Sequence, residues 1–188
     1  LRIRHHHPSE VNDMKRYMLI LFMVLVVSVS GCTSEDAGSE NQTKTFTGNN
    51  VSFEYPSDWV TANSLANDTV AAVGDPSSVD SSGLAQVSVV IQSKDLKGNL
   101  YDMYRANYEA LFTNSSYRRV SETNTTIGSY QAIENLYIIT DSGIQKKQRA
   151  IWIENNGRVY VILCTAPADK FDAESRNFDL IVRTLRFL

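Results

Sequence analysis

The chain has 188 residues and a mass of 21.1 kDa, which is enough for one domain and a short additional segment. Its composition, 43% hydrophobic and 10% aromatic, supports a packed core and excludes a wholly disordered chain. The formal net charge of −3 gives no electrostatic basis for binding nucleic acid, so we expect no nucleic-acid partner.

Residues 14–31 have the three parts of a secretory signal peptide. A basic pair directly follows Met14, an apolar stretch covers residues 17–29, and small residues close the segment. The apolar stretch is shorter than the ~20 residues that a transmembrane helix needs, and an uncleaved anchor is the alternative. Residues 1–13 do not fit the start of a signal peptide, and we interpret them as an N-terminal extension ahead of the true start.

The signal segment ends in Val-Ser-Gly-Cys at residues 29–32, which resembles a prokaryotic lipobox. In that motif the cysteine thiol is acylated and the chain is cut before it. The motif predicts lipid attachment at Cys32 and a location on the extracytoplasmic face of the cell membrane. The polar residues 32–44 then form a flexible tether, and residues 45–188 form the folded domain.

Residues 45–188 show strand patterns interrupted by two helical ones. In chain order the predicted elements are strands at 51–55, 70–73 and 85–92, a helix at 99–112, strands at 131–140, 144–154 and 159–164, and a helix at 169–184. We expect Asp169 or Asp172 to cap this last helix at its N-terminus.

The Asn-Gly pair at 156–157 is the strongest hairpin signal, because both residues tolerate positive φ. A two-residue turn at this point places Trp152 opposite Val161. The strand 159–164 is apolar on both faces, so we expect it at the centre of a sheet that is covered on both sides. The pattern therefore predicts an α+β fold, an α/β/α sandwich in which helices flank an antiparallel β-sheet.

Two stretches of the sequence, FTGNNVSFEYPSDWV at 46–60 and IWIENNGRVYVILCTAPADKFDAESRNFDLIVRTLRF at 151–187, resemble the PsbP-like family. The resemblance implies the sandwich fold that this family shares with Mog1, and lipoproteins of this type occur in prokaryotes, including methanogenic archaea. Plant and algal members are extrinsic subunits of photosystem II that help to retain calcium and chloride. Nothing in this sequence indicates photosynthesis, so we do not carry that role over.

Histidine is missing from the predicted mature domain, since all three histidines precede Met14. This excludes serine or cysteine catalysis with a histidine base, and the histidine-based metal sites of some family members. Cys164, in an apolar strand, is interpreted as a buried small hydrophobic residue. We therefore expect no catalysis, metal site or cofactor, while weak calcium binding by the acidic loop 75–80 stays an alternative. A carboxylate-dependent hydrolase is a further alternative, with candidate residues Glu54, Asp58, Glu134 and Glu154.

Basic residues concentrate locally in two segments of the predicted domain. If the two segments lie on neighbouring strands, they form a docking patch for an acidic partner in an extracytoplasmic complex. Edge-strand cations that prevent aggregation are the alternative interpretation. The candidate patch consists of Arg118, Arg119, Lys146, Lys147 and Arg149.

Five Asn-x-Ser/Thr motifs predict surface N-glycosylation if the host performs it. Asn50 lies next to a predicted strand and is the least convincing of them. The other four fall in predicted loops or in the tether and are Asn41, Asn67, Asn114 and Asn124.

These observations predict a membrane-anchored extracytoplasmic lipoprotein whose PsbP-like domain is a non-catalytic binding, assembly or accessory module. A calcium-dependent scaffold, a small-molecule or glycan binder and the hydrolase remain open at this stage. Trp59, which we expect to be a core residue, would line the groove of a glycan or peptide binder.

Overall fold

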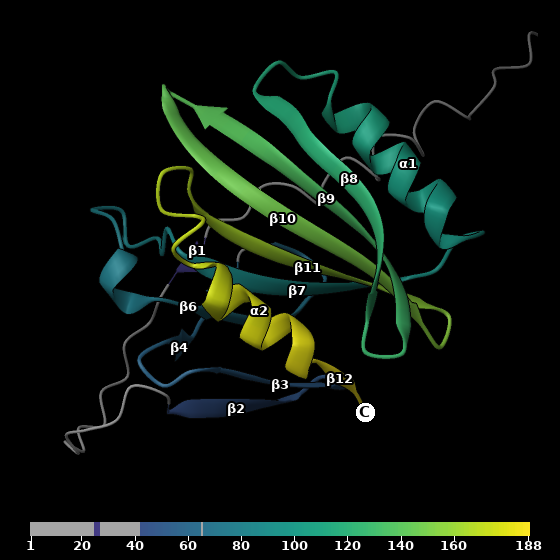
Figure 1. Ribbon diagram of the computed structural model, residues 1–188, viewed down its shortest axis with the longest axis horizontal. Coiled ribbons are helices and arrows are strands. Elements are labelled where there is room, and N and C mark those ends of the chain that lie inside the picture. Colours follow the sequence, from purple (N-terminus) through teal and green to yellow (C-terminus); the bar gives the residue numbers. More distant parts are fainter. Residues whose placement is uncertain (1–24, 27–41, 65) are drawn as a thin grey trace, which may run out of the picture.

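The computed structural model describes residues 42–64 and 66–188, together with the backbone of residues 25–26. A seven-stranded antiparallel sheet forms its centre (Figure 1). In spatial order its strands are β4 (Val60–Thr61), β6 (Thr69–Gly74), β7 (Ser88–Asp95), β11 (Arg158–Pro167), β10 (Ile144–Asn155), β9 (Tyr130–Asp141) and β8 (Tyr117–Ile127).

Two helices and a smaller sheet pack on the two faces of this sheet (Figure 1). One face is covered by α1 (Leu100–Leu111), and the other by α2 (Ser175–Thr184). This arrangement of helices on both faces of an antiparallel sheet confirms the predicted α+β sandwich. The described part of the chain contains no helix with the length and hydrophobicity needed to cross a membrane. The smaller strands are β12 (Arg186–Phe187), β3 (Val51–Pro56) and β2 (Thr43–Gly48), which form one sheet in that order, and β1 (Leu25–Val26), which pairs with β5 (Asn63–Ser64).

The strand β11 lies between β7 and β10, at the centre of the large sheet, as its sequence predicts. Its side chains alternate between the two faces, and both sets are buried. Val161 belongs to the core on the α1 side, while Ile162 belongs to the core on the α2 side. A strand that is buried on both faces needs apolar residues at consecutive positions, which explains its unbroken hydrophobic run.

The β10–β11 hairpin has the predicted register. Trp152 lies opposite Val161, and the turn between the strands consists of Asn156 and Gly157. Both turn residues have positive φ, +49° and +72° respectively, the conformation that a two-residue turn requires at these positions. The hairpin places Trp152 on the α1 side of the sheet, where it reaches the site described below.

The two helices begin differently. Asn99 caps α1, because its side-chain oxygen accepts a hydrogen bond from the backbone N–H of Asp102 at 2.9 Å. The predicted cap of α2 is wrong: the helix begins later, after Glu174, and no side chain caps it. Residues 168–174 instead form turns, in which the carbonyl of Pro167 accepts backbone hydrogen bonds.

Apart from the two-residue strands β1, β4, β5 and β12, two strands of the structure were not predicted from the sequence. The first, β2, begins at Thr43, so the last two residues assigned to the tether belong to the folded domain. The second, β8, was not predicted because its residues 118–124 are all exposed and lack an alternating apolar pattern. This strand forms an edge of the sheet, and its register shifts between Arg119 and Ser121.

Candidate functional site

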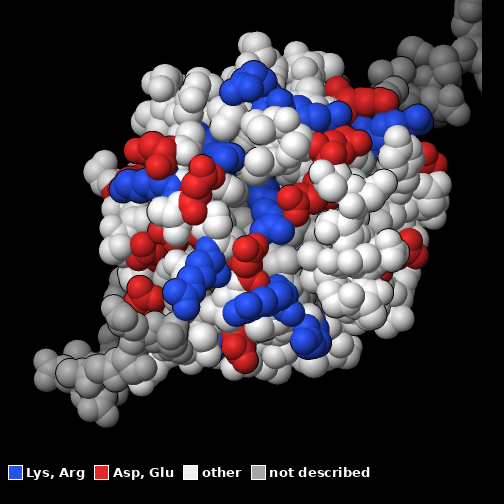
Figure 2. Space-filling model, viewed as in Figure 1, with Lys and Arg blue, Asp and Glu red and all other residues white. Residues whose placement is uncertain are grey.

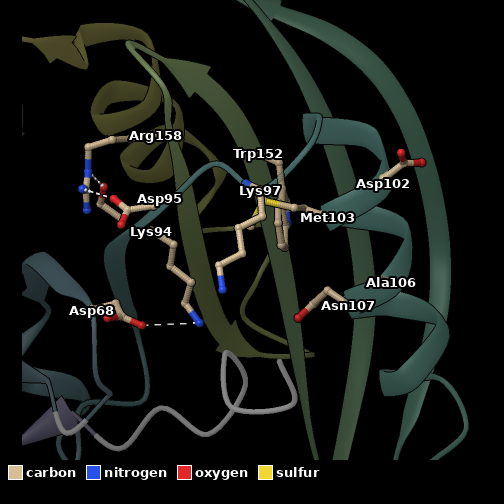
Figure 3. Close-up of a pocket in the computed structure, with 11 residues that line it drawn as sticks. Asp68, Lys94, Asp95, Lys97, Asp102, Met103, Ala106, Asn107, Trp152 and Arg158 are labelled. Atoms are coloured by element: carbon tan, nitrogen blue, oxygen red, sulfur yellow. Dashed lines mark hydrogen bonds and ion pairs between the residues drawn. The ribbon is translucent and has the colours of Figure 1, made fainter. Parts of the chain in front are cut away.

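A pocket of about 490 Å³ opens between α1 and the neighbouring strands β7, β10 and β11 (Figure 3). We call it the α1 pocket. Its residues come from six segments: the turn before β6, the end of β7, the loop that follows, helix α1, and one position each on β10 and β11. All but the first turn and the loop are regular elements of the fold, so the walls of the pocket are held by the sheet and the helix.

Part of the pocket wall is apolar. Trp152 is 1% exposed, and its indole N–H donates to the hydroxyl of Tyr108 at 3.1 Å, which fixes the ring. Met103 on α1 accepts a hydrogen bond at its sulfur from the backbone N–H of Lys97 at 3.1 Å. Together with Ala106, these side chains form a surface that favours an apolar group.

Two ion pairs lie along the side of the pocket that β7 and β11 form. Lys94 and Asp68 pair at 3.4 Å, and Arg158 and Asp95 pair at 2.6 Å. The guanidinium of Arg158 also donates to the hydroxyl of Ser93 at 2.8 Å. The charged residues of the rim are thereby held in defined positions next to the apolar wall.

Three polar side chains extend toward the middle of the α1 pocket in Figure 3, two with an amine nitrogen and Asn107 with its amide oxygen. Lys94 and Lys97 enter from the β7 side, and Asn107 enters from α1. The side-chain nitrogen of Asn107 is buried and has no hydrogen-bond partner. A buried donor without an acceptor costs about 1–3 kcal/mol, so this amide is a local cost to the stability of the α1 side.

Hydrogen-bonded tyrosines form the core behind the pocket. Tyr104 donates to Glu122 at 2.8 Å and accepts a hydrogen bond from Asn135 at 2.9 Å. Tyr137 donates to Gln148 at 2.7 Å. Burial raises the pKa of both phenols above the ordinary value of 10.0, so they stay protonated at neutral pH and are not general bases.

The predicted docking patch does not form, because β9 lies between β8 and β10 (Figure 1). Lys147 pairs with Asp172 at 2.9 Å. Arg149 pairs with Glu134 at 2.8 Å and with Asp179 at 2.6 Å. These cations of β10 hold α2 and β9 in place, and their charge is already compensated within the domain.

The remaining basic residues lie on two faces of the sheet. Arg118 on β8 and Lys147 on β10 both lie opposite Ile138 of β9, and they face the α2 side. Arg119 and Lys146 lie opposite residues of β9 that face the α1 side. Arg119 pairs with Glu122 at 3.1 Å. Figure 2 correspondingly shows basic and acidic residues interspersed on the viewed face. The interpretation of the five residues as one surface is therefore wrong.

The four carboxylates considered for hydrolysis are not brought together. Glu54 and Asp58 line a groove of about 830 Å³ between β3 and α2, beside two arginines of that helix. Glu134 is held by Arg149, and Glu154 is exposed near the end of β10. The structure therefore brings at most two of the four carboxylates to one groove.

The acidic loop 75–80 uses its carboxylates within the loop. Asp80 accepts hydrogen bonds from the backbone N–H groups of Ser82 and Leu84 at 2.8 and 3.1 Å, and from the amide of Gln86 at 2.7 Å. Hydrogen bonding, led by the Ser82 side chain, lowers the pKa of Asp80. No group of three or more metal-ligating side chains occurs among the described residues.

Cys164 is fully buried on β11, as predicted, and burial raises the pKa of its thiol to about 12. The thiol is therefore neither ionised nor accessible at neutral pH. Cys32, the predicted site of lipid attachment, and Asn41, one predicted glycosylation site, lie outside the described residues.

Three of the predicted glycosylation sites are exposed. Asn67 and Asn114 lie in turns, in agreement with the sequence prediction. Asn124 lies within β8 and not in a loop, because that strand was missed. Trp59, the alternative groove residue, is 1% exposed and packs against Phe178 in the core.

Sequence reasoning did not identify the α1 pocket. Asp68, Lys94 and Asn107 are far apart in the chain, and each looks like an ordinary surface residue in its own segment. The available signal was the hairpin register, which places Trp152 on the face that α1 covers. The charged residues around Trp152 come together only when α1 packs against β7. The hydrophobic periodicity of the sequence does not specify that packing.

Solved structures with a similar fold include three proteins with low sequence identity to this chain. The cyanobacterial PsbP protein CyanoP from Synechocystis sp. PCC 6803 is 10% identical, with a TM-score of 0.57 over 82% of this chain and 98% of that one. LpqN from Mycobacterium tuberculosis is 11% identical, with a TM-score of 0.54 over 77% and 89%. A variant of Mog1 is 12% identical, with a TM-score of 0.51 over 78% and 96%.

A search of curated proteins found no match. The family model described as PsbP-like protein, in contrast, matches residues 27–187, which include both stretches on which the sequence resemblance depends. The fold, its structural neighbours and this match agree: the chain belongs to the family of PsbP-like proteins.

Proposed function

We propose that this protein is a membrane-anchored extracytoplasmic lipoprotein whose PsbP-like domain acts as a non-catalytic binding or accessory module, with the α1 pocket as its binding site. The observation that carries the proposal is the α1 pocket itself. It combines an apolar wall at Trp152 and Met103 with ionic side chains, and helix and sheet hold it open. Such a combination is typical of ligand sites.

The chemistry of the domain favours binding over catalysis. The thiol of Cys164 is buried and protonated, and the buried phenols have raised pKa values. Four charged residues of the pocket form two ion pairs, Lys94 with Asp68 and Arg158 with Asp95, an arrangement that does not place a nucleophile beside a base. These features support a pocket that binds its ligand without reacting with it.

A role at the cell envelope agrees with the sequence and with one structural neighbour. The segment ending at Cys32 resembles a lipobox. LpqN, which has the same fold, is described as involved in cell envelope biogenesis. An accessory protein tethered to a membrane would meet its ligand or partner at that surface.

The binding role is tested by photo-cross-linking in native membranes. A photoreactive amino acid at Ala106, an exposed residue on the wall of the pocket, should give a discrete cross-linked product that mass spectrometry identifies. The same amino acid at the exposed Lys170, before α2, is the matched control. Equal products from both positions would show random collision and would contradict the assignment of the site.

The anchor is tested separately by fractionation. Replacing the thiol in Cys32→Ser should release the protein from the membrane fraction or leave a larger, unprocessed species. If the variant is processed and retained like the unchanged protein, the lipid-anchor part of the proposal is wrong. The pocket assignment does not depend on that result.

A further inference from the structure

We infer that a second pocket, on the same face of the central sheet as α1, binds an uncharged molecule with an apolar body and one oxygen-bearing group. We call it the hairpin pocket, because the turn between β9 and β10 borders it. Its volume is about 380 Å³, and it shares no residue with the α1 pocket. The inference therefore goes beyond the proposed function, which uses the α1 pocket.

The floor of the hairpin pocket is a row of side chains across three strands. Ser88 of β7 lies opposite Thr165 of β11, which in turn lies opposite Gln148 of β10. Thr165 follows Leu163 by two positions and so shares its face, the α1 side of the sheet. No residue of α1 lines the pocket, and β9 and β10 extend beyond that helix in Figure 1. The helix thus leaves this end of the floor open.

Two hydroxyl groups of the floor keep hydrogen-bonding capacity. Ser88 is 4% exposed, and its hydroxyl has no hydrogen-bond partner among the residues that the structure describes. Tyr137 donates to Gln148 at 2.7 Å, and Gln148 donates to the hydroxyl of Thr165 at 2.9 Å. This series of bonds leaves the hydroxyl hydrogen of Thr165 for a further acceptor. A carbonyl or hydroxyl oxygen of a ligand can accept from both floor residues.

The walls of the hairpin pocket are largely apolar. Tyr117, which is 8% exposed, and Ile139 border the floor, while Leu84 and Ala85 come from the loop that precedes β7. Ile144, at the start of β10, lies on the rim and is 64% exposed. A large apolar side chain exposed beside a pocket is typical of a binding surface. The apolar body of a ligand would remove part of this surface from water.

The loop wall is held in place before any ligand binds. The carboxylate of Asp80 accepts hydrogen bonds from the backbone N–H of Leu84 at 3.1 Å and from the amide of Gln86 at 2.7 Å. Val79 and Ala85 form an isolated antiparallel bridge that closes the base of the loop. The acidic loop that the sequence offered as a calcium site therefore forms one side of the pocket.

The charges of the hairpin pocket favour an uncharged ligand. Lys146 and Asp141, which have opposite signs, both lie at the β9–β10 end, and Asp80 lies across from them in the loop. Burial, together with the charge of Asp141, raises the pKa of Tyr117, so this phenol stays neutral at pH 7. The floor itself consists of hydroxyl and amide groups. No single sign of charge dominates the pocket, and its buried part is neutral.

Disulfide tethering tests the inference on the mature protein. Ile144→Cys places a thiol on the rim, and Tyr101→Cys, at an exposed position of α1, is the matched control. Cys164 is buried, and the unchanged protein gives the background from any other thiol. Each variant is equilibrated with the disulfide of N-(2-mercaptoethyl)benzamide and with 2-mercaptoethanol, and intact-mass spectrometry measures the modified fraction.

We expect Ile144→Cys to retain the benzamide fragment at an about tenfold higher concentration of 2-mercaptoethanol than Tyr101→Cys. Fragments that carry a carboxylate or an aminomethyl group on the same ring should lose most of this advantage, because the neutral floor does not compensate their charge. Equal retention by the two cysteine variants would overturn the inference. Equal retention of the charged and uncharged fragments would overturn the assigned class of ligand.

Removing a floor hydroxyl locates the bound oxygen. Ser88→Ala, combined with Ile144→Cys, should lower the retention of the benzamide fragment by about fivefold, since one hydrogen bond is lost. Ser121→Ala, at an exposed position of β8, is the control and should have no effect. Thr165→Val tests the same floor if Ser88→Ala lowers the melting temperature. Unchanged retention in both floor variants would contradict the hydrogen-bonding part of the inference.

The outcomes separate this inference from the proposed function. Ser88→Ala should leave the specific cross-link from Ala106 unchanged, because the two pockets share no residue. If the fragment preference is absent while that cross-link forms, only the hairpin pocket assignment fails. If the preference is found without a specific cross-link from Ala106, the α1 pocket assignment fails and the hairpin pocket stands.

Discussion

The two sides of the central sheet are built differently. On the α2 side, apolar residues of α2, β3 and the sheet pack into one continuous core, which ion pairs of Lys147 and Arg149 close at the surface. On the α1 side, tyrosines and buried amides form hydrogen bonds behind a pocket. A buried polar group is costly unless it is paired, and the side-chain nitrogen of Asn107 and the side-chain oxygen of Asn135 have no partner among the described residues, so we expect the α1 side to contribute less stability than the α2 side. Under the proposed function, stability and recognition belong to opposite faces of the sheet.

The largest effect should follow from Phe178→Ala on the α2 side. Phe178 is 0% exposed and contacts Trp59 and Phe171, so the free energy of unfolding should fall by about 3–5 kcal/mol. Urea denaturation measures the change. Met103→Ala, on the partly buried pocket wall, should cost less stability than Phe178→Ala and should instead reduce the specific cross-link formed from Ala106. Equal losses of stability from the two variants would remove the distinction between the faces.

A smaller effect is expected from Tyr108→Phe on the α1 side. The substitution keeps the ring but leaves the buried indole N–H of Trp152 without its acceptor, at a cost of about 1–3 kcal/mol. Thermal unfolding measures the loss, and Trp152 fluorescence should report a changed environment. Tyr101→Phe removes the hydroxyl of a tyrosine that is 54% exposed and is the control, for which we expect no change. A neutral Tyr108→Phe would mean that the polar core does not position Trp152.

The smallest effect concerns the ion pairs of the α2 side. Arg149→Met should lower the free energy of unfolding by about 1–2 kcal/mol, since the methionine keeps the apolar packing while the hydrogen bonds to Glu134 and Asp179 are lost. A double-mutant cycle with Asp179→Asn isolates that pair. Because Asp179 is largely exposed, its coupling should weaken in molar salt. A coupling that does not depend on salt would show that packing, and not charge, holds α2.

The sequence predicts most of the framework and little of the site. The Asn156–Gly157 turn and the hydrophobic run of β11 are local patterns, and they correctly place Trp152 and the centre of the sheet. The predicted start of α2 was wrong because residues 168–174 form turns closed by backbone carbonyls, among them that of Pro167, and no aspartate side chain caps the helix. The α1 pocket depends on how a helix packs beside strands distant in sequence, which no local pattern records.

The irregular edge strand β8 has a consequence for a protein held at a membrane. Under the proposed anchoring, copies diffuse in a plane, where neighbours meet more often than they do in free solution. A long, straight edge would offer such neighbours a template for strand pairing. The register shift around Val120, with Arg119 and Glu122 beside it, interrupts that template. Under the proposed anchoring, crowding on the membrane therefore need not lead to sheet-to-sheet assembly.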